Sequence, residues 1–308
     1  MTALTAVIIT GNEERNIERC LKSLQGVADE VVVVDSGSTD RTETICRQYG
    51  VRFVSHAWAG YSGQKNYADS LATHPWTLSL DADEALSPTL RDALMRLKQE
   101  GPAAGTVYSV NRLTNFCGHW IHHCGWYPDR KVRLWATGTA HWEGDIHEEL
   151  RFEGTPQTAH LEGDLLHYSY YEIDDLARRQ PRYYRLGAAE AHAQGRRAGM
   201  GAVVLKPLWT FVRDYLLRGG FRDGKAGYIL CRMNAHYTFM KYTTLTEMQD
   251  KPNQPPAGDK QHNSSCPKKT IATETFSAAT AANRKNDCTK PPPSCSARTS
   301  VPSLTAWC

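Results

Sequence analysis

Three short apolar runs, each ending in polar or acidic side chains, constrain the fold of this chain more than any other feature. The runs lie within AVIITGNEERN (6–16), EVVVVDSGSTD (30–40) and WTLSLDADE (76–84). The segments between them space their apolar residues as helices do, for example from Ile17 to Leu24. Strands that alternate with helices predict an α/β domain with a mainly parallel sheet. Ligands of such sheets bind at the carboxyl ends of the strands, where these runs place their polar residues.

The same patterns predict the individual elements. We expect strands at 4–10, 31–34, 51–54, 76–80, 106–113 and 131–135. We expect one helix to begin at Asn12, a second to end at Gly50, a third to span 61–72 and a fourth to begin at Ser87-Pro88, where proline suits the first turn. A polar, acidic loop or strand end is expected at 141–150, and helical, basic chain from about Asp174.

The C-terminal part of the chain differs in composition from the rest. Residues 251–308 carry 8 basic and 3 acidic side chains, hold 8 of the 15 prolines and show no apolar periodicity. This composition predicts a disordered tail, and a frameshifted or otherwise non-native end is an open alternative. We therefore divide the chain into a sheet domain (1–150), a helical region (151–250) and the tail (251–308).

The carboxylates after the third apolar run are candidate metal ligands. Asp81 and Asp83 lie two residues apart, so in extended chain their side chains point the same way. Mg²⁺ and Mn²⁺ prefer oxygen ligands and commonly bind through one or two carboxylates plus substrate phosphates. Taken alone, the same residues are explained equally well as an acidic turn that caps the helix at Ser87.

Taken together, the ordered motifs ITGNEERN, VVDSGSTD and LDADE resemble the inverting nucleotide-sugar glycosyltransferases of family 2, whose Rossmann-like fold is called GT-A. The resemblance implies a UDP-sugar donor and Mg²⁺ or Mn²⁺ held by Asp81 and Asp83 against its diphosphate. The nucleotide-sugar-binding residues it implies are Thr10, Asn12, Glu13, Asp35, Ser38, Gln64, Lys65, Asn66 and Asp81. The alternatives are helix capping by Asp35 and Ser38, and an ordinary surface lysine at position 65. One departure is Gly11, where relatives usually carry a larger residue.

Inverting transfer is a single in-line displacement, which needs one general base for the acceptor hydroxyl. The candidate carboxylates are Glu143, Asp145, Glu148 and Glu149. The family pattern of a glycine followed shortly by His-Glu is matched by Gly144, His147 and Glu148. We therefore expect Glu148 to be the base, with Asp145 as the alternative, although any one of these acids could be solvated and idle.

The segment FCGHWIHHCGWYPDRKVRLW (116–135) resembles one branch of the family, the bacterial β-1,4-glucosyltransferases of the lipopolysaccharide inner core. This implies glucose transfer from UDP-glucose to a lipid-linked oligosaccharide. The acceptor-binding residues we expect are Trp126, Arg130, Arg133 and His147. A zinc site is the alternative for Cys117, His119, His122, His123 and Cys124, but their spacing matches no standard zinc motif.

The helical region is basic and amphipathic. Residues 196–245 contain 9 Lys or Arg and 2 acids. The apolar stripe consists of Leu205, Leu208, Trp209, Val212 and Leu216, and the opposite face carries Lys206, Thr210, Arg213 and Asp214. No apolar run approaches the roughly 18 residues of a spanning helix. We expect a cytoplasmic protein whose residues 200–245 contact the anionic inner face of the membrane without crossing it.

Other functional classes fit the sequence less well. A nucleotidyltransferase would need a glycine-rich, basic loop after the first strand, where TGNEERN is acidic. A non-catalytic nucleotide-sugar binding protein would tolerate loss of the candidate metal ligands and bases, yet both are present. The basic helices follow a helical period rather than a nucleic-acid-binding motif, so we expect no nucleic acid partner. Within family 2, a different donor or a polyprenyl-phosphate acceptor remains an open alternative.

Overall fold

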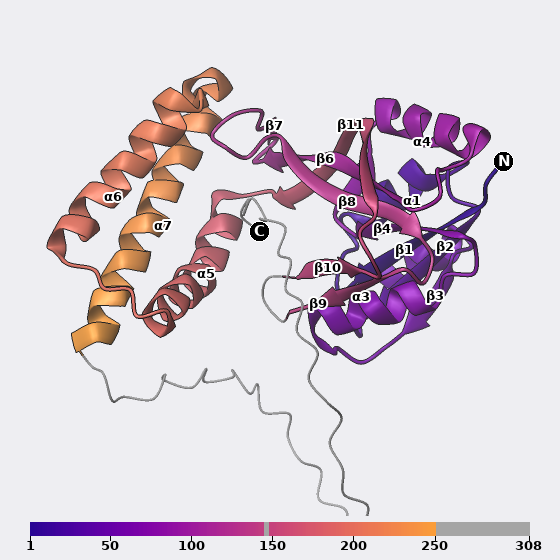
Figure 1. Cartoon of the computed structure of the whole chain (residues 1–308), viewed down its shortest axis with the longest axis horizontal. Coiled ribbons are helices and arrows are strands. Elements are labelled where there is room, and N and C mark those ends of the chain that lie inside the picture. The colour runs from indigo at the N-terminus through magenta and orange to yellow at the C-terminus, as the bar shows by residue number, and fades with distance from the viewer. Residues whose placement is uncertain (145–147, 251–308) are drawn as a thin grey trace, which may run out of the picture. The chain divides into compact units, whose positions relative to one another are not determined.

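The computed structural model describes residues 1–144 and 148–250 (Figure 1). The strands are β1 (Leu4–Thr10), β2 (Glu30–Asp35), β3 (Arg52–Ser55), β4 (Trp76–Asp81), β5 (Glu84–Leu86), β6 (Thr106–Phe116), β7 (His119–Trp120), β8 (Asp129–Ala136), β9 (Ala140–Glu143), β10 (Glu149–Phe152) and β11 (Gln157–Tyr170). The helices are α1 (Ile17–Leu24), α2 (Thr42–Gln48), α3 (Gly60–Ser70), α4 (Pro88–Glu100), α5 (Ile173–Ala193), α6 (Met200–Val212) and α7 (Gly224–Asp250), with a π-helical turn η1 (Arg213–Leu217) and a 3₁₀ turn η2 (Gly220–Asp223). The tail expected at 251–308 lies outside the described residues.

The main sheet has the strand order β3-β2-β1-β4-β8-β6-β11-β5. Strand β1 pairs in parallel with β2 and β4, and β2 pairs in parallel with β3. Strand β8 runs antiparallel between β4 and β6. The register sets Thr10 beside Asp35 and Ile9 beside Asp81, so the three polar strand ends meet at one edge of the sheet. The expected α/β class with a mainly parallel sheet is confirmed.

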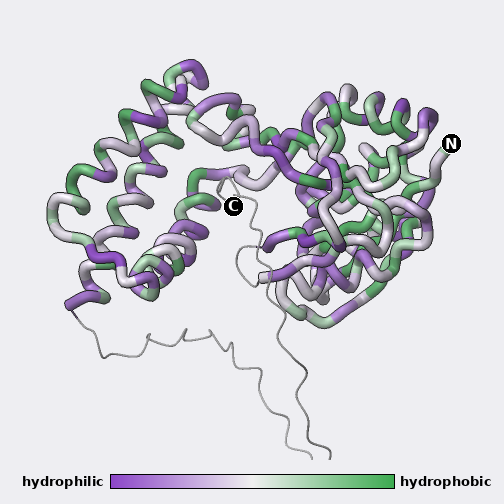
Figure 2. Tube along the Cα trace, in the orientation of Figure 1, coloured by the Kyte–Doolittle hydropathy of each residue, from purple (hydrophilic) through white to green (hydrophobic). Residues whose placement is uncertain are grey.

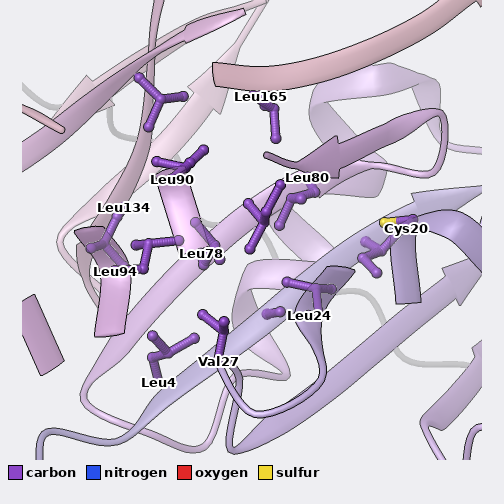
Figure 3. Packing of buried hydrophobic residues seen from close by; sticks show 14 of the residues in the cluster. Leu4, Cys20, Leu24, Val27, Leu78, Leu80, Leu90, Leu94, Leu134 and Leu165 are labelled. Atoms are coloured by element: carbon purple, nitrogen blue, oxygen red, sulfur yellow. The ribbon is translucent and has the colours of Figure 1, made fainter. Parts of the chain in front are cut away.

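Helices cover both faces of the parallel strands. On one face, leucines of α1 and α4 pack on β4 and β8, as Figure 3 shows for Leu24, Leu78, Leu94 and Leu134. On the other face, Ala68 of α3 packs on the valines of β1 and β2. Each fully buried leucine contributes about 1.5–3 kcal/mol relative to an exposed one. The core therefore fixes the strands, and with them the strand ends that carry the candidate site.

Two helix starts illustrate how local chemistry sets the element bounds. The helix expected from Asn12 begins at Ile17, because Asn12 adopts φ 56 and its side-chain oxygen accepts a bond from Thr39 N at 2.8 Å. The helix expected at Ser87-Pro88 begins there, with the Ser87 hydroxyl accepting from Leu90 N at 3.2 Å. Residues 12–16 are thus a loop that faces the strand edge.

Strand β11 contradicts the assignment of all of 151–250 to a helical region. It pairs in parallel with β6 and antiparallel with β5, so the main sheet continues to Tyr170. Its buried residues are four apart (Leu161, Leu165 and Ser169), and two register shifts interrupt the pairing. The alternation that identifies a strand is therefore missing from its sequence. At Gly163 (φ 94) a Cβ would lie 2.4 Å from Leu90 N, so β11 and α4 require a glycine there.

After Tyr170 the chain is helical, as expected. Helix α7 contacts both α5 and α6, with Leu245 packed on alanines of α5. Near the start of α7, Leu230 and Cys231 pack on Phe116 and Ile121, which lie at the end of β6 and just beyond it. Among the described residues, every helix is too short or too polar to cross a bilayer.

Candidate active site

Two carboxylates project from the edge where β4 ends. Asp81 and Asp83 are partly exposed, whereas Ala82 and Glu84 between and after them are buried. This alternation matches the expectation that the two aspartates share one side. The buried Glu84 accepts a bond from Asp81 N at 3.0 Å and so holds the turn. The edge therefore presents two neighbouring carboxylates to solvent.

Arg133 of β8 is a buried cation that pairs with carboxylates at this strand edge. Its Nη2 lies 3.1 Å from Asp81 Oδ2 and 2.6 Å from Glu84 Oε1. Burial raises the pKa of Asp81, but Lys65 and Arg133 outweigh burial and hold that pKa well below its usual range. Arg133 is buried and paired with two acids, so its guanidinium faces the interior of the site. The expected role of Arg133 in acceptor binding stays a prediction. Arg130, three residues earlier, is exposed.

Replacing Arg133 with methionine is expected to lower the free energy of unfolding by about 3–5 kcal/mol, because Glu84 would remain buried without its counter-charge. The matched control is Arg130→Met on the same strand, which should change stability by roughly 0.5 kcal/mol or less. Urea unfolding of the three proteins measures the difference. Equal midpoints for both variants would show that the Arg133 contacts do not stabilise the site.

Lys65 of α3 joins the metal-ligand candidates to the expected base. Its Nζ donates to Glu148 Oε2 at 2.7 Å and lies 3.4 Å from Asp81 Oδ1. The ammonium also sits 4.6 Å from the ring centroid of Trp142. Burial lowers the pKa of Lys65, but the two carboxylates outweigh it, so the pKa is raised and the ammonium stays charged. Residues far apart in sequence therefore meet here.

The other base candidates are placed differently. Glu143 and Glu149 are exposed and pair with Arg151 on the β9–β10 ribbon. Asp145 and His147 lie outside the described residues. Of the three described candidates, Glu148 shares a bonded partner with Asp81.

The loops after β1 and β2 are tied to each other at the same edge. Asp35 Oδ2 accepts from Gly37 N at 2.9 Å and Ser38 N at 2.8 Å, and Oδ1 accepts from the Ser38 hydroxyl. The Ser38 hydroxyl in turn accepts from Asn12 N at 2.7 Å. Asp35 is buried and bonds the loop, whereas α2 begins at Thr42 without a side-chain cap, so the helix-capping alternative does not describe these contacts. Asn12 and Ser38 remain at the loop surface, and the role of these residues in nucleotide binding stays a prediction.

Two further loop residues complete that edge. The Thr10 hydroxyl is buried, with no hydrogen-bond partner among the described residues. Burial raises the pKa of Glu13, which nevertheless accepts a bond from Asn16 Nδ2 at 2.8 Å. At Gly11 a Cβ would lie 2.5 Å from Ser36 Oγ, which donates to Thr10 O. The glycine that departs from the family pattern therefore makes room for the Ser36 hydroxyl.

Helix α3 does not present Gln64, Lys65 and Asn66 as one cluster. Gln64 is 0% exposed and bonds His56 through both amide atoms. Asn66 donates to Trp142 O at 2.9 Å and accepts from Trp142 N at 2.7 Å, which attaches β9 to the helix. Consecutive helical residues point about 100° apart, so the three side chains leave the helix in different directions. In the structure Gln64 and Asn66 bond the fold, and their role in nucleotide binding stays a prediction.

A histidine of β11 that was not among the predicted site residues also lies beside Asp83. His167 Nε2 is 3.3 Å from Asp83 Oδ2. Burial raises the pKa of Asp83, and the imidazole outweighs this effect, so that pKa is lowered. The segment HYSYY (167–171) carried a signal in its aromatic content, but it was missed because β11 itself was not predicted.

Three arginines stack on the tyrosines of this segment. The guanidinium of Arg19 lies 3.7 Å from the ring centroid of Tyr168, and that of Arg15 lies 3.4 Å from that of Tyr171. Arg179 donates to Ser169 Oγ at 2.6 Å. Within the described ranges no carboxylate pairs with any of the three. Arg19 Nη1 donates to Asn16 Oδ1 at 3.3 Å and to the Tyr171 hydroxyl at 3.2 Å, and the other N–H groups of these arginines can meet an anion.

The Cys/His segment after β6 has a packing role in the structure. His123 Nδ1 lies 2.7 Å from Asp223 Oδ1, and Cys124 packs with Cys231 in the interior. Trp126 is half-buried, and its ring centroid lies 5.7 Å from that of Tyr170. In the described part of the chain, no three His, Cys, Asp or Glu side chains are arranged to hold a metal by themselves. A cation at the Asp81–Asp83 edge would therefore need oxygens from its substrate.

Comparisons with known proteins agree with this architecture. The model of the family described as glycosyl transferase family 2 matches residues 5–163. The chain is 31% identical to the lipopolysaccharide core biosynthesis glycosyltransferase LpsC of Rhizobium meliloti, over 77% of this chain and 89% of that protein. It is 27% identical to an uncharacterized glycosyltransferase of Rickettsia typhi, over 80% and 88%.

Among solved structures, glucosyl-3-phosphoglycerate synthase from Mycobacterium tuberculosis is 23% identical with a TM-score of 0.31. That alignment covers 37% of this chain and 44% of the synthase. The family assignment depends instead on the family model and on the full-length relatives, and the sheet topology is consistent with GT-A. The chain belongs to glycosyltransferase family 2 and is a glycosyltransferase.

Proposed function

We propose that the protein transfers a hexose, glucose from UDP-glucose, to the lipopolysaccharide inner core or a similar lipid-linked glycan. Transfer inverts the anomeric centre and depends on Mg²⁺ or Mn²⁺. The observation that carries the proposal is the bridge from Asp81 through Lys65 to Glu148, which sets a candidate base beside the candidate metal ligands. The resemblance to a lipopolysaccharide core glycosyltransferase supports the acceptor class.

The donor set at the strand edge fits a divalent cation. Asp81 and Asp83 supply partly exposed carboxylate oxygens, and His167 orients Asp83 through the 3.3 Å contact with its Oδ2. The two carboxylates would hold the ion, with donor phosphates completing the coordination. When bound, the cation neutralises the leaving diphosphate.

The chain's own cations are placed to assist. Arg133 and Lys65 keep Asp81 ionised and fix its position. The guanidinium groups of Arg15, Arg19 and Arg179 are held against tyrosines or Ser169, so their N–H edges are preorganised for phosphate oxygens.

Glu148 is suited to take the acceptor proton. Lys65 binds its Oε2, and within the described residues its Oε1 has no bond. The proton of the acceptor hydroxyl would pass to Oε1 of Glu148 as the hydroxyl oxygen of the acceptor attacks the anomeric carbon. The bond from that carbon to the diphosphate would break on the opposite side. Lys65 thus positions the base without blocking it.

The proposal includes peripheral contact with the cytoplasmic face of an anionic membrane, where a lipid-linked acceptor would be met, and no nucleic acid partner. The basic, amphipathic helices after residue 196 support this contact.

A donor panel tests the function. Thermal shift with UDP-glucose, UDP-galactose, GDP-mannose and dTDP-glucose in Mg²⁺ should show the largest stabilisation with UDP-glucose, because binding to the native state raises its stability. Purified lipopolysaccharide core should then accept the sugar. Binding without any transfer or hydrolysis would identify a nucleotide-sugar binding protein instead, and preference for another donor would change the substrate.

A further inference from the structure

Helix α6 and the turn η1 expose most of their large aliphatic side chains and bury two polar ones. Leu205, Leu208 and Trp209 are 64%, 60% and 53% exposed. Thr210 and Asp214, on the opposite side, are buried, with Asp214 only 2% exposed. A surface helix of a globular protein normally shows the reverse arrangement.

The buried polar side is bonded to the protein interior. Asp214 Oδ1 accepts from Arg213 Nε at 2.8 Å and from Arg218 Nη1 at 3.3 Å. Asn234 of α7 donates to Asp214 Oδ2 at 3.4 Å, and Thr210 Oγ1 lies 3.2 Å from Thr238 Oγ1 of α7. These contacts fix which side of α6 faces α7, so the apolar side faces away from it.

We call this apolar side the outer α6 surface. Its members are large apolar residues that are all more than half exposed. They are Met200, Val204, Leu205, Leu208, Trp209, Leu216, Leu217 and Phe221. Figure 2 shows the apolar segments along α6. An apolar patch that is continuous along a helix indicates an interaction surface.

The charges around this surface have one sign. Residues 196–232 contain 8 Lys or Arg, and the two acids are Asp214 and Asp223. Asp214 is turned inward as described, and the nearly buried Asp223 pairs with His123. The solvent-facing ionised side chains of this stretch are therefore all basic.

We propose that the outer α6 surface lies in the headgroup layer of an anionic lipid bilayer, with its apolar side chains inserted and its basic residues on lipid phosphates. The inference rests on the proposed function because a lipid-linked acceptor would be met at a membrane. An in-plane helix with an apolar face and basic flanks is the usual form of such contact. A second copy of the chain would set two basic surfaces against each other. The proposal shortens the segment expected to contact the membrane from residues 200–245 to residues 200–222, because α7 packs against both α5 and α6.

The turn η2 connects the outer α6 surface to the loop after β7, which carries His123 and Trp126. Asp223 of η2 accepts from His123 N at 2.9 Å, in addition to its contact with the His123 ring. In η2, a Cβ at Gly220 would lie 2.7 Å from Cys231 Sγ, which shows how closely the turn is packed. A bilayer contact at α6 would therefore hold the loop that carries Trp126 near the lipid surface.

Vesicle co-sedimentation of the full chain tests the proposal. Wild type should bind phosphatidylcholine vesicles that contain phosphatidylglycerol far better than phosphatidylcholine alone. Leu205→Gln/Leu208→Gln should weaken this binding on the order of tenfold or more, since two inserted leucines are lost. High salt should weaken wild-type binding without abolishing it, because screening leaves apolar insertion intact.

Phe239→Gln is the matched control, because Phe239 is an exposed apolar residue of α7 outside the outer α6 surface; it should bind as wild type does. Equal binding to neutral and anionic vesicles, or unchanged binding by the leucine double variant, would overturn the proposal. So would a wild-type dimer that the double variant dissociates without any vesicle binding. UDP-glucose thermal shift on the same preparations separates this result from the proposed function, since donor binding does not require lipid.

Discussion

Asp83→Ala is expected to lower metal-dependent turnover by on the order of 10³-fold or more, since several kcal/mol of charge stabilisation at the leaving diphosphate would be lost. The fold should persist, because Asp83 is partly exposed and its described side-chain partner is His167. Nucleoside diphosphate release from UDP-glucose in Mn²⁺ measures the effect.

Glu162→Ala provides the control for this variant. Glu162 is an exposed acid on β11 that pairs with Arg96. It lies five residues before His167 on the same strand. It should retain wild-type turnover. Wild-type activity of Asp83→Ala in Mn²⁺ would show that the metal assignment is wrong.

Glu148→Gln is expected to lower the transfer rate by about 10²–10⁴, the usual range for loss of a general base. Glutamine keeps the shape and a carbonyl oxygen for Lys65, so UDP-sugar affinity should stay near that of wild type. Donor affinity and transfer rate should be measured on one preparation.

Glu149→Gln is the matched control, since Glu149 is the exposed neighbour that pairs with Arg151. Normal transfer by Glu148→Gln, with collapse in Asp145→Asn, would move the role of base to Asp145.

The sequence was sufficient for the strands whose surroundings are simple. Strands β1, β2 and β4 are buried on both faces, so their apolar runs identify them directly. Strand β11 was missed because its register shifts break the period of two. His167 and the tyrosines beside Asp83 were missed with it.

Several site residues could not be assigned because their partners are distant in sequence. Arg133 looked like an exposed basic residue, and its two acids lie on β4 and at the start of β5, 52 and 49 positions away. The cluster at 64–66 matched a motif by type, but helix geometry separates its members. For α6, the apolar stripe was visible in the sequence, yet periodicity cannot tell which side of the helix faces the protein. The contacts of Asn234 with Asp214 and of Thr238 with Thr210 set the polar side against α7.

The central claim is metal-dependent sugar transfer from a nucleotide donor, and chelation tests it most directly. Release of UDP from UDP-glucose, with lipopolysaccharide core as acceptor, should be measured before and after treatment with EDTA and again after adding Mn²⁺ or Mg²⁺. We expect release to stop on chelation and to return with the metal, because the Asp81–Asp83 edge can stabilise the leaving diphosphate only through a bound cation. Undiminished UDP release by the chelated protein would contradict it.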